Sequence, residues 1–216
     1  MILAINTAFG EANLALQTKN KTILKSLDSN AKHSENMLKT IDEMCQEAFV
    51  NINDVDCLAV VLGPGSFTGL RIGTAICQAL GCVNDKLKFI GISSLQLMGQ
   101  IVKENNLCDG EYVCVLNALS GLYFVANFDK DGILLVKERM INEAELGSIK
   151  CQMFGLENDL SIDGVQNIKI TSKDLLDYAN SKFERGEFSS QNEMLPLYLR
   201  LSQAEDSLLK KSKKDL

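Results

Sequence analysis

The sequence predicts an α/β fold built from two tandem lobes, each of which opens with three strands. Three consecutive strand-like segments occur at the start of the chain and again about 110 residues later. Between them, continuous apolar segments alternate with helical patterns, as in proteins whose strands are buried on both faces. Because the chain has 216 residues, 46% of them hydrophobic, it is long enough for one large or two small domains.

The first lobe is expected to span residues 1–106. The helix after its third strand is predicted by apolar residues that recur at a helical spacing on one face. The next strand is a continuous apolar run that stops at Gly63-Pro64. The expected elements are, in order, strands at 2–5, 12–17 and 22–27, a helix at 35–49, a strand at 57–62, a helix at 70–83, a strand at 89–92 and a helix at 95–104.

The second lobe is expected to span residues 107–216, because the polar stretch 105–110 interrupts the pattern. It is smaller and more degenerate, and the sequence leaves open whether its end packs back on the first lobe. Residues 207–216 carry four lysines and predict a solvated tail, or else a small basic contact. The expected elements are strands at 112–116, 122–128 and 133–139, a short helix within 141–149, a short strand at 153–155 and a helix at 173–182.

Composition restricts the classes of function. The formal net charge is −6, and an acidic chain is a poor match for tRNA phosphates, so tRNA contact is expected to come indirectly through a partner. Seven cysteines without a CxxC pair predict reduced thiols in the cytoplasm, and a single histidine predicts no metal site. No apolar run is long enough for a membrane span, and the N-terminus lacks the basic segment of a signal peptide.

A glycine-rich stretch, GPGSFTGLRIG, follows the strand at 57–62. We expect a tight strand-to-helix turn here, with Ser66 or Thr68 as the helix N-cap. Such a turn directs backbone N–H groups toward one point and can hold a phosphate, so Gly63, Gly65, Ser66 and Gly69 form a turn that resembles a phosphate site. The alternative is that the glycines only permit close packing. The stretch matches neither a Walker A loop nor a Rossmann fingerprint.

These residues closely resemble the TsaB (YeaZ) family, which takes part in making threonylcarbamoyladenosine beside the tRNA anticodon. Three further segments agree with that family in order: ILAINTAFGEANLAL at the start, Lys32-His33-Ser34-Glu35 ahead of the first helix, and Pro196-Leu197-Tyr198-Leu199-Arg200 near the end. The resemblance implies two actin-like lobes of the ribonuclease H-like (ASKHA) type, each with a mixed sheet.

Two positions depart from active ATPases of that fold. Such enzymes place a metal-ordering Asp in the first turn of each lobe, whereas this chain has Asn6 and Asn117. An amide lacks the negative charge that a hard cation prefers. The related TsaD family binds metal through two histidines on one helix, but here His33 is followed four residues later by Met37. We therefore expect no catalytic residue, no metal and no cofactor required by this subunit.

The resemblance implies a non-catalytic scaffold subunit that docks and activates the catalytic paralogue TsaD, with the ATPase TsaE joining the pair. Docking is expected through the helices at 35–49 and 69–83, and a homodimer could use the same helices. ATP or ADP could bind at the boundary of the complex. The expected interface residues are Met37, Leu38, Ile41, Leu70, Ile72, Ile76 and Ala79.

Other interpretations remain open at this stage. The helix at 69–83 is apolar nearly all round, which predicts a cover on more than one side, but the second lobe could supply that cover within the chain. The chain could instead be a nucleotide-dependent actin-like phosphotransferase or ATPase that acts alone, which the turn at 63–69 favours and the two asparagines oppose. It could also be a homodimer with no second kind of partner.

Overall fold

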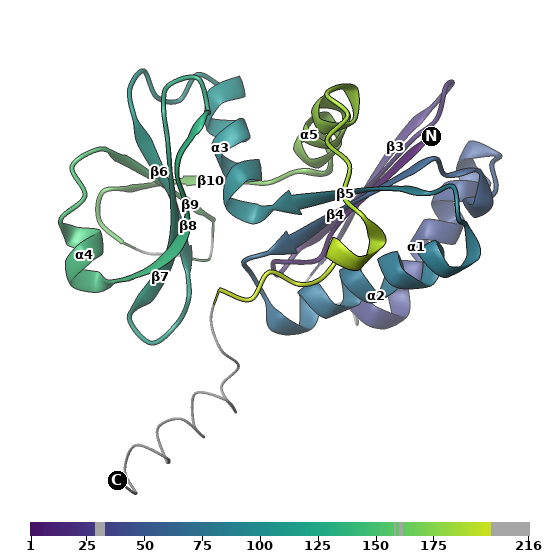
Figure 1. The fold of residues 1–216 in the computed structure, drawn as a ribbon, viewed down its shortest axis with the longest axis horizontal. Helices are drawn as coiled ribbons and strands as arrows, with labels where there is room; N and C mark the ends of the chain where they lie inside the picture. Colours follow the sequence, from purple (N-terminus) through teal and green to yellow (C-terminus); the bar gives the residue numbers. More distant parts are fainter. Residues whose placement is uncertain (29–32, 158, 160–161, 200–216) are drawn as a thin grey trace, which may run out of the picture.

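The computed structural model describes residues 1–28, 33–157, 159 and 162–199. Two five-stranded mixed sheets, each flanked by helices, form two lobes that lie next to each other (Figure 1). The prediction of two mixed sheets with flanking helices is therefore confirmed. The lysine-rich segment 207–216 and Arg200 lie outside the described residues, as do the side chains of His33 and Ser34.

The sheet of the first lobe has the strand order β3-β2-β1-β4-β5. The first three strands pair antiparallel, whereas β4 and β5 pair parallel to β1 and to each other. All five expected strands are present with their ends within one residue of the prediction. They are β1 (Ile2–Asn6), β2 (Ala12–Gln17), β3 (Thr22–Leu27), β4 (Cys57–Gly63) and β5 (Lys88–Ser93).

Helices cover both faces of this sheet. On one face, α1 (His33–Ala48) and α2 (Phe67–Val83) pack over alternate strand residues such as Leu3 and Leu14. On the other face, α3 (Ser94–Glu104) and α5 (Ser172–Glu184) bury Ala4 and Ala15. Because side chains alternate along a strand, each helix pair has its own apolar core. Figure 1 shows α5 and the α1–α2 pair on opposite sides of the sheet.

The second sheet has the order β10-β9-β6-β7-β8, and α3 also packs against it. The core between this sheet and α3 includes Tyr112 and Phe128, whose ring centroids are 5.4 Å apart in a stacked arrangement. Its elements are β6 (Tyr112–Asn117), β7 (Leu122–Phe128), β8 (Leu134–Asn142), α4 (Glu143–Gly147), β9 (Gln152–Leu156) and β10 (Val165–Ile168).

Two differences from the expected elements lie in this lobe. The strand β10 was not expected from the sequence, because it is an edge strand whose central Gln166 and Asn167 are exposed and give no apolar signal. The strand β8 continues to Asn142, which then caps α4 by accepting a hydrogen bond from the Glu145 N–H, so the helix expected within 141–149 is only five residues long.

Helix starts follow the capping residues. Ser66 accepts a hydrogen bond from the Gly69 N–H, and this cap starts α2 at Phe67, three residues before the expected position. Ser93 and Thr171 act in the same way for α3 and α5. In each case one side-chain oxygen accepts a hydrogen bond from an N–H group that has no backbone partner within the helix.

The last described segment, residues 188–199, crosses back over the first lobe, and we call it the strap. It includes the 3-10 turn Gln191–Glu193. The side chain of Gln78 on α2 donates to the carbonyls of Gln191 (3.0 Å) and Met194 (3.2 Å). Farther along, the Leu197 N–H donates to the Leu62 carbonyl at 2.7 Å. One side of α2 is therefore covered by residues more than 100 positions away in the chain.

A search of the described residues found no helix that is both long and apolar enough to cross a membrane.

The seven cysteine thiols should differ sharply in reactivity. Burial raises the pKa of the Cys57 and Cys77 thiols to about 12 and that of Cys114 well above its ordinary value, so these groups stay protonated near neutral pH. We expect a thiol-specific reagent at pH 8 to label exposed Cys82 first and half-buried Cys108 and Cys151 more slowly. The buried cysteines should react only after denaturation. Rapid labelling of all seven in the native protein would contradict this fold.

Candidate functional site

The glycine-rich turn between β4 and α2 lies directly against the β1–β2 turn. The Ser66 N–H donates to the Ala8 carbonyl at 2.7 Å, and the Thr7 hydroxyl donates to the Gly69 carbonyl at 2.7 Å. The Gly69 N–H bonds the Ser66 side chain, and the Leu70 N–H bonds the Ser66 carbonyl. Three amides that could face a phosphate are therefore already bonded within the chain.

The glycines of this turn allow that close approach. A Cβ on Gly65 would lie 2.5 Å from the Ala8 carbonyl oxygen, and one on Gly69 would lie 1.8 Å from the Thr7 carbonyl oxygen. Gly63 has a φ of +120°, which L side chains rarely adopt. These contacts favour the packing interpretation of the glycines, because each is needed for the backbone itself.

Asn6 and Asn117 end the first strand of each lobe and form the same local structure. Each side-chain oxygen accepts the N–H two residues later, from Ala8 at 3.0 Å and from Leu119 at 2.8 Å. Asn6 is fully buried, and its amide group donates to the Asn13 side chain at 3.3 Å. Both amides therefore stabilise turns, and Asn6 does not reach the space between the lobes.

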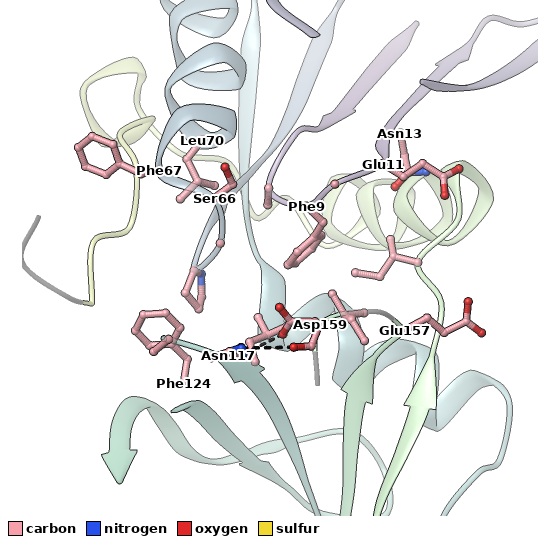
Figure 2. Close-up of a pocket in the computed structure, with 18 of the residues that line it drawn as sticks. Phe9, Glu11, Asn13, Ser66, Phe67, Leu70, Asn117, Phe124, Glu157 and Asp159 are labelled. Carbon is pink, nitrogen blue, oxygen red and sulfur yellow. Dashed lines mark hydrogen bonds between the residues drawn. The ribbon is translucent and has the colours of Figure 1, made fainter. Parts of the chain in front are cut away.

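A cleft of about 1460 Å³ lies between the lobes, and Figure 2 shows the side chains that line it. The first lobe contributes Phe9 and the glycine-rich turn, and the second contributes Asn117 and Phe124. Its ionisable lining is mostly acidic: Lys169 is the one basic side chain in the described lining, and it pairs with Glu11 at 3.2 Å. The other acidic lining residues are Asp28, Glu157 and Asp159.

Asp159 is the acid nearest to the turn of the second lobe. Its carboxylate accepts a hydrogen bond from the Asn117 N–H at 2.8 Å (Figure 2). Burial raises the pKa of Asp159, and this hydrogen bond only partly opposes the effect. No group of three or more His, Cys, Asp or Glu side chains that could hold a metal ion occurs among the described residues. The ionisable side chains that line the cleft are thus mostly acidic.

The seven residues expected at a partner interface divide into two sets in the structure. Met37, Ile41 and Ile76 lie in the core beneath α1 and α2, and Leu70 lies in the core on the other face of the sheet. Leu38 and Ala79 are exposed, and Ile72 is half-buried. The buried residues hold the two helices in place, so only the second set can touch another molecule directly.

The outer face of α2 carries small side chains. Ala75, Ala79 and Cys82 are exposed and recur at helical spacing, and Arg71 extends this line toward the start of the helix. On the neighbouring α1, Leu38 is 61% exposed. We call Leu38, Arg71, Ala75, Ala79 and Cys82 the outer face. Short side chains allow another backbone to approach α2 closely.

A cluster at one end of the outer face was not predicted from the sequence. The Arg71 guanidinium lies 3.8 Å above the Phe67 ring, and its Nε donates to the Tyr198 hydroxyl at 3.0 Å. The Phe67 and Tyr198 rings are 5.1 Å apart. Because Tyr198 belongs to the strap, 127 residues from Arg71, no local pattern could have indicated this contact.

Comparisons with known proteins match the related TsaD and TsaB proteins. The family model described as "TsaD: tRNA N6-adenosine threonylcarbamoyltransferase" matches residues 27–150, more than half of the chain. The "tRNA threonylcarbamoyladenosine biosynthesis protein TsaB" of Haemophilus influenzae is 33% identical over 57% of this chain, a match that spans about half (52%) of that protein. Its counterpart in Escherichia coli is 25% identical, over 92% of this chain and 94% of that protein.

A solved structure gives the same fold. The structure titled "YeaZ from Pseudomonas aeruginosa" superposes with a TM-score of 0.74, covering 92% of this chain and 99% of that one at 20% identity. At this identity the match supports the two-lobed fold, and the position of each functional side chain must come from this chain itself.

Replacing Gly69 by alanine should destabilise the protein by roughly 3 kcal/mol, because the new methyl group would overlap the Thr7 carbonyl oxygen. Gly110→Ala is the matched control, since no atom lies within 4 Å of its added Cβ, and it should change stability by less than about 0.5 kcal/mol. Urea denaturation of the three proteins measures both effects. Equal stability of the two variants would show that the turn is not tightly packed.

The Asp159→Asn variant should gain stability relative to the wild type as the pH rises. The pKa of Asp159 is raised in the folded state, so its ionisation destabilises the native protein above the unfolded pKa of about 3.9. Asparagine can still accept the Asn117 N–H but carries no charge. The unfolding free energy of the variant minus that of the wild type, measured by urea denaturation, should increase from pH 4 to pH 7. A constant difference would contradict the assignment.

Proposed function

The chain belongs to the TsaB (YeaZ) family, and from that membership we propose that it is a non-catalytic subunit in tRNA threonylcarbamoyladenosine biosynthesis. The observation that carries the proposal is the exposed outer face with its short side chains. The chain has an asparagine, not an acid, where the first strand of each lobe ends. An exposed helix face with short side chains would allow another protein to pack closely against it.

The cleft argues against an ATPase that acts alone. An actin-like enzyme needs an acid in its first turn to order a cation, but here buried Asn6 is fully engaged in its own turn. The Ser66 N–H is bonded to the β1–β2 turn, so the two loops touch where a phosphate would have to fit between them. Nucleotide hydrolysis by this chain would lack the acid that orders a cation at the first turn of each lobe, where the chain has Asn6 and Asn117.

The proposed partner is the catalytic paralogue, a TsaD-type subunit. The outer face suits a helix from another chain, because alanines at 75 and 79 permit close packing while Leu38 adds apolar area. The residues expected from the sequence remain the basis of this proposal: Leu38, Ile72 and Ala79 would make contact, with Met37, Ile41, Leu70 and Ile76 as their support. Docking there would hold the partner's active site in a competent arrangement.

The rest of the complex follows from the same proposal. TsaE would join the heterodimer, and ATP or ADP would bind at the subunit boundary and not within this chain alone. A homodimer through the same outer face would compete with the heterodimer. Contact with tRNA would come from the partner, because this chain carries a net charge of −6. Such an assembly would act in the cytoplasm.

Ala79→Glu should weaken binding to the TsaD-type subunit from the same cell by at least about tenfold, because it places a long charged side chain in the proposed contact. Glutamate is a good helix former at this exposed position, so the stability of the free chain should change by less than about 0.5 kcal/mol. Ile76→Glu is unsuitable, since Ile76 is buried and the variant would unfold. Isothermal titration and light scattering measure the binding.

The control for this prediction is Ala144→Glu, which adds the same charge at an exposed helical position in the other lobe. It should bind like the wild type. If Ala79→Glu also binds like the wild type, the outer face is not the docking surface. If the wild-type chain alone hydrolyses ATP at a substantial rate, the enzymatic alternative replaces this proposal.

A further inference from the structure

We propose that Phe67, Arg71 and Tyr198 form the anchor of the partner interface, and that Arg71 there receives a carboxylate from the other subunit. This inference rests on the proposed function, because it specifies how the outer face recognises its partner. The group contains one arginine and two aromatic rings, which are residue types that dominate the energetics of protein interfaces. We call these three residues the arginine anchor.

The anchor is already ordered before any partner binds. The guanidinium lies over the Phe67 ring, with 3.8 Å between its central carbon and the ring centroid. Its Nε donates to the Tyr198 hydroxyl, which fixes the rotation of the planar group. The strap is held in turn by the hydrogen bond from Leu197 to Leu62. Pre-ordering lowers the entropy that binding must overcome.

The guanidinium still has unused donors. Arginine carries five N–H donors, and the bond to Tyr198 uses only the one on Nε. Among the described residues no carboxylate pairs with Arg71, whereas Arg185 binds Glu187 and Arg139 binds the Asn127 side chain. The two terminal nitrogens of Arg71 thus present a fork whose geometry matches a carboxylate with two oxygens.

The surroundings favour a protein carboxylate over a phosphate. Arg71 contacts the Phe67 ring and the Tyr198 hydroxyl, and Leu195 and Leu197 are exposed apolar residues of the same strap as Tyr198. The cleft opens beside the anchor, because Phe67 and Tyr198 also line it, and its mostly acidic side chains disfavour a polyphosphate or nucleic acid with many negative charges more than a single carboxylate. A single carboxylate within an apolar contact would instead be paired and desolvated by the anchor.

The anchor is continuous with the outer face. Arg71 lies one helical turn before Ala75, on the same exposed side of α2. A partner helix that packs on the alanines would pass the guanidinium at the start of α2. The small residues then set the distance between the two helices, and Arg71 sets their register by pairing with one acid.

The test measures binding to the TsaD-type subunit for the wild type, Arg71→Ala, Arg71→Lys and Tyr198→Phe by isothermal titration, with thermal unfolding to confirm folding. Arg71→Ala should weaken binding at least about 30-fold. Arg71→Lys keeps the charge but loses the fork, so it should recover only a small part of the affinity. Tyr198→Phe should weaken binding roughly threefold to tenfold, because Arg71 remains but is less well oriented.

Arg185→Ala is the matched control, since it removes one positive charge at the C-cap of α5, the helix on the opposite side of the sheet from α2, and should bind like the wild type. Wild-type affinity for Arg71→Ala, or for Arg71→Lys, would overturn the carboxylate anchor while leaving the proposed function intact. A loss of tRNA retention by the complex with unchanged subunit affinity would overturn it in favour of a phosphate contact. If the wild type itself does not bind the subunit, the proposed function fails and the anchor fails with it.

Discussion

The contact between the β1–β2 turn and the first turn of α2 is the constraint on which the rest of the structure depends. Two backbone segments meet closely there, joined by the bond from the Ser66 N–H to the Ala8 carbonyl and by the bond from the Thr7 hydroxyl to the Gly69 carbonyl. Only glycine at 65 and 69 permits this distance. The contact fixes the start of α2 on the sheet, and therefore the direction in which its outer face points.

The same contact explains why the cleft and the outer face have different characters. At the glycine-rich turn the chain packs backbone against backbone, and the asparagines of both first turns stabilise those turns. The remaining cleft is large but acidic. Meanwhile α2 is held from three sides, by the sheet, by α1 and by the strap, which leaves one exposed line of small residues. A rigid helix with a single exposed line is well suited to recognition.

Much of this architecture could be predicted from the sequence, because its signals are local. The continuous apolar run before Gly63 marked β4, and serines and threonines marked the helix starts. The edge strand β10 gave no such signal, since its central residues are polar. Helical periodicity correctly placed Met37 and Ile41 on the apolar face of α1, but periodicity does not tell whether such a face meets its own sheet or another chain.

The arginine anchor could not be predicted from the sequence. Arg71 and Tyr198 both belong to segments that the sequence analysis singled out, yet nothing in either segment indicates that they touch. Contacts of this kind depend on the path of the strap across α2, which the whole fold determines. The candidate site was therefore predictable as a set of segments but not as a set of contacts.

Hydrogen–deuterium exchange of the chain, alone and mixed with the TsaD-type subunit, tests the central claim most directly. The account predicts slower exchange of backbone amides in α1, in α2 and in the strap when the partner is added, with the cleft-lining strands of the second lobe unchanged. Protection confined to the cleft, or no protection anywhere, would contradict the claim that α2 is held in place to be covered by a second protein.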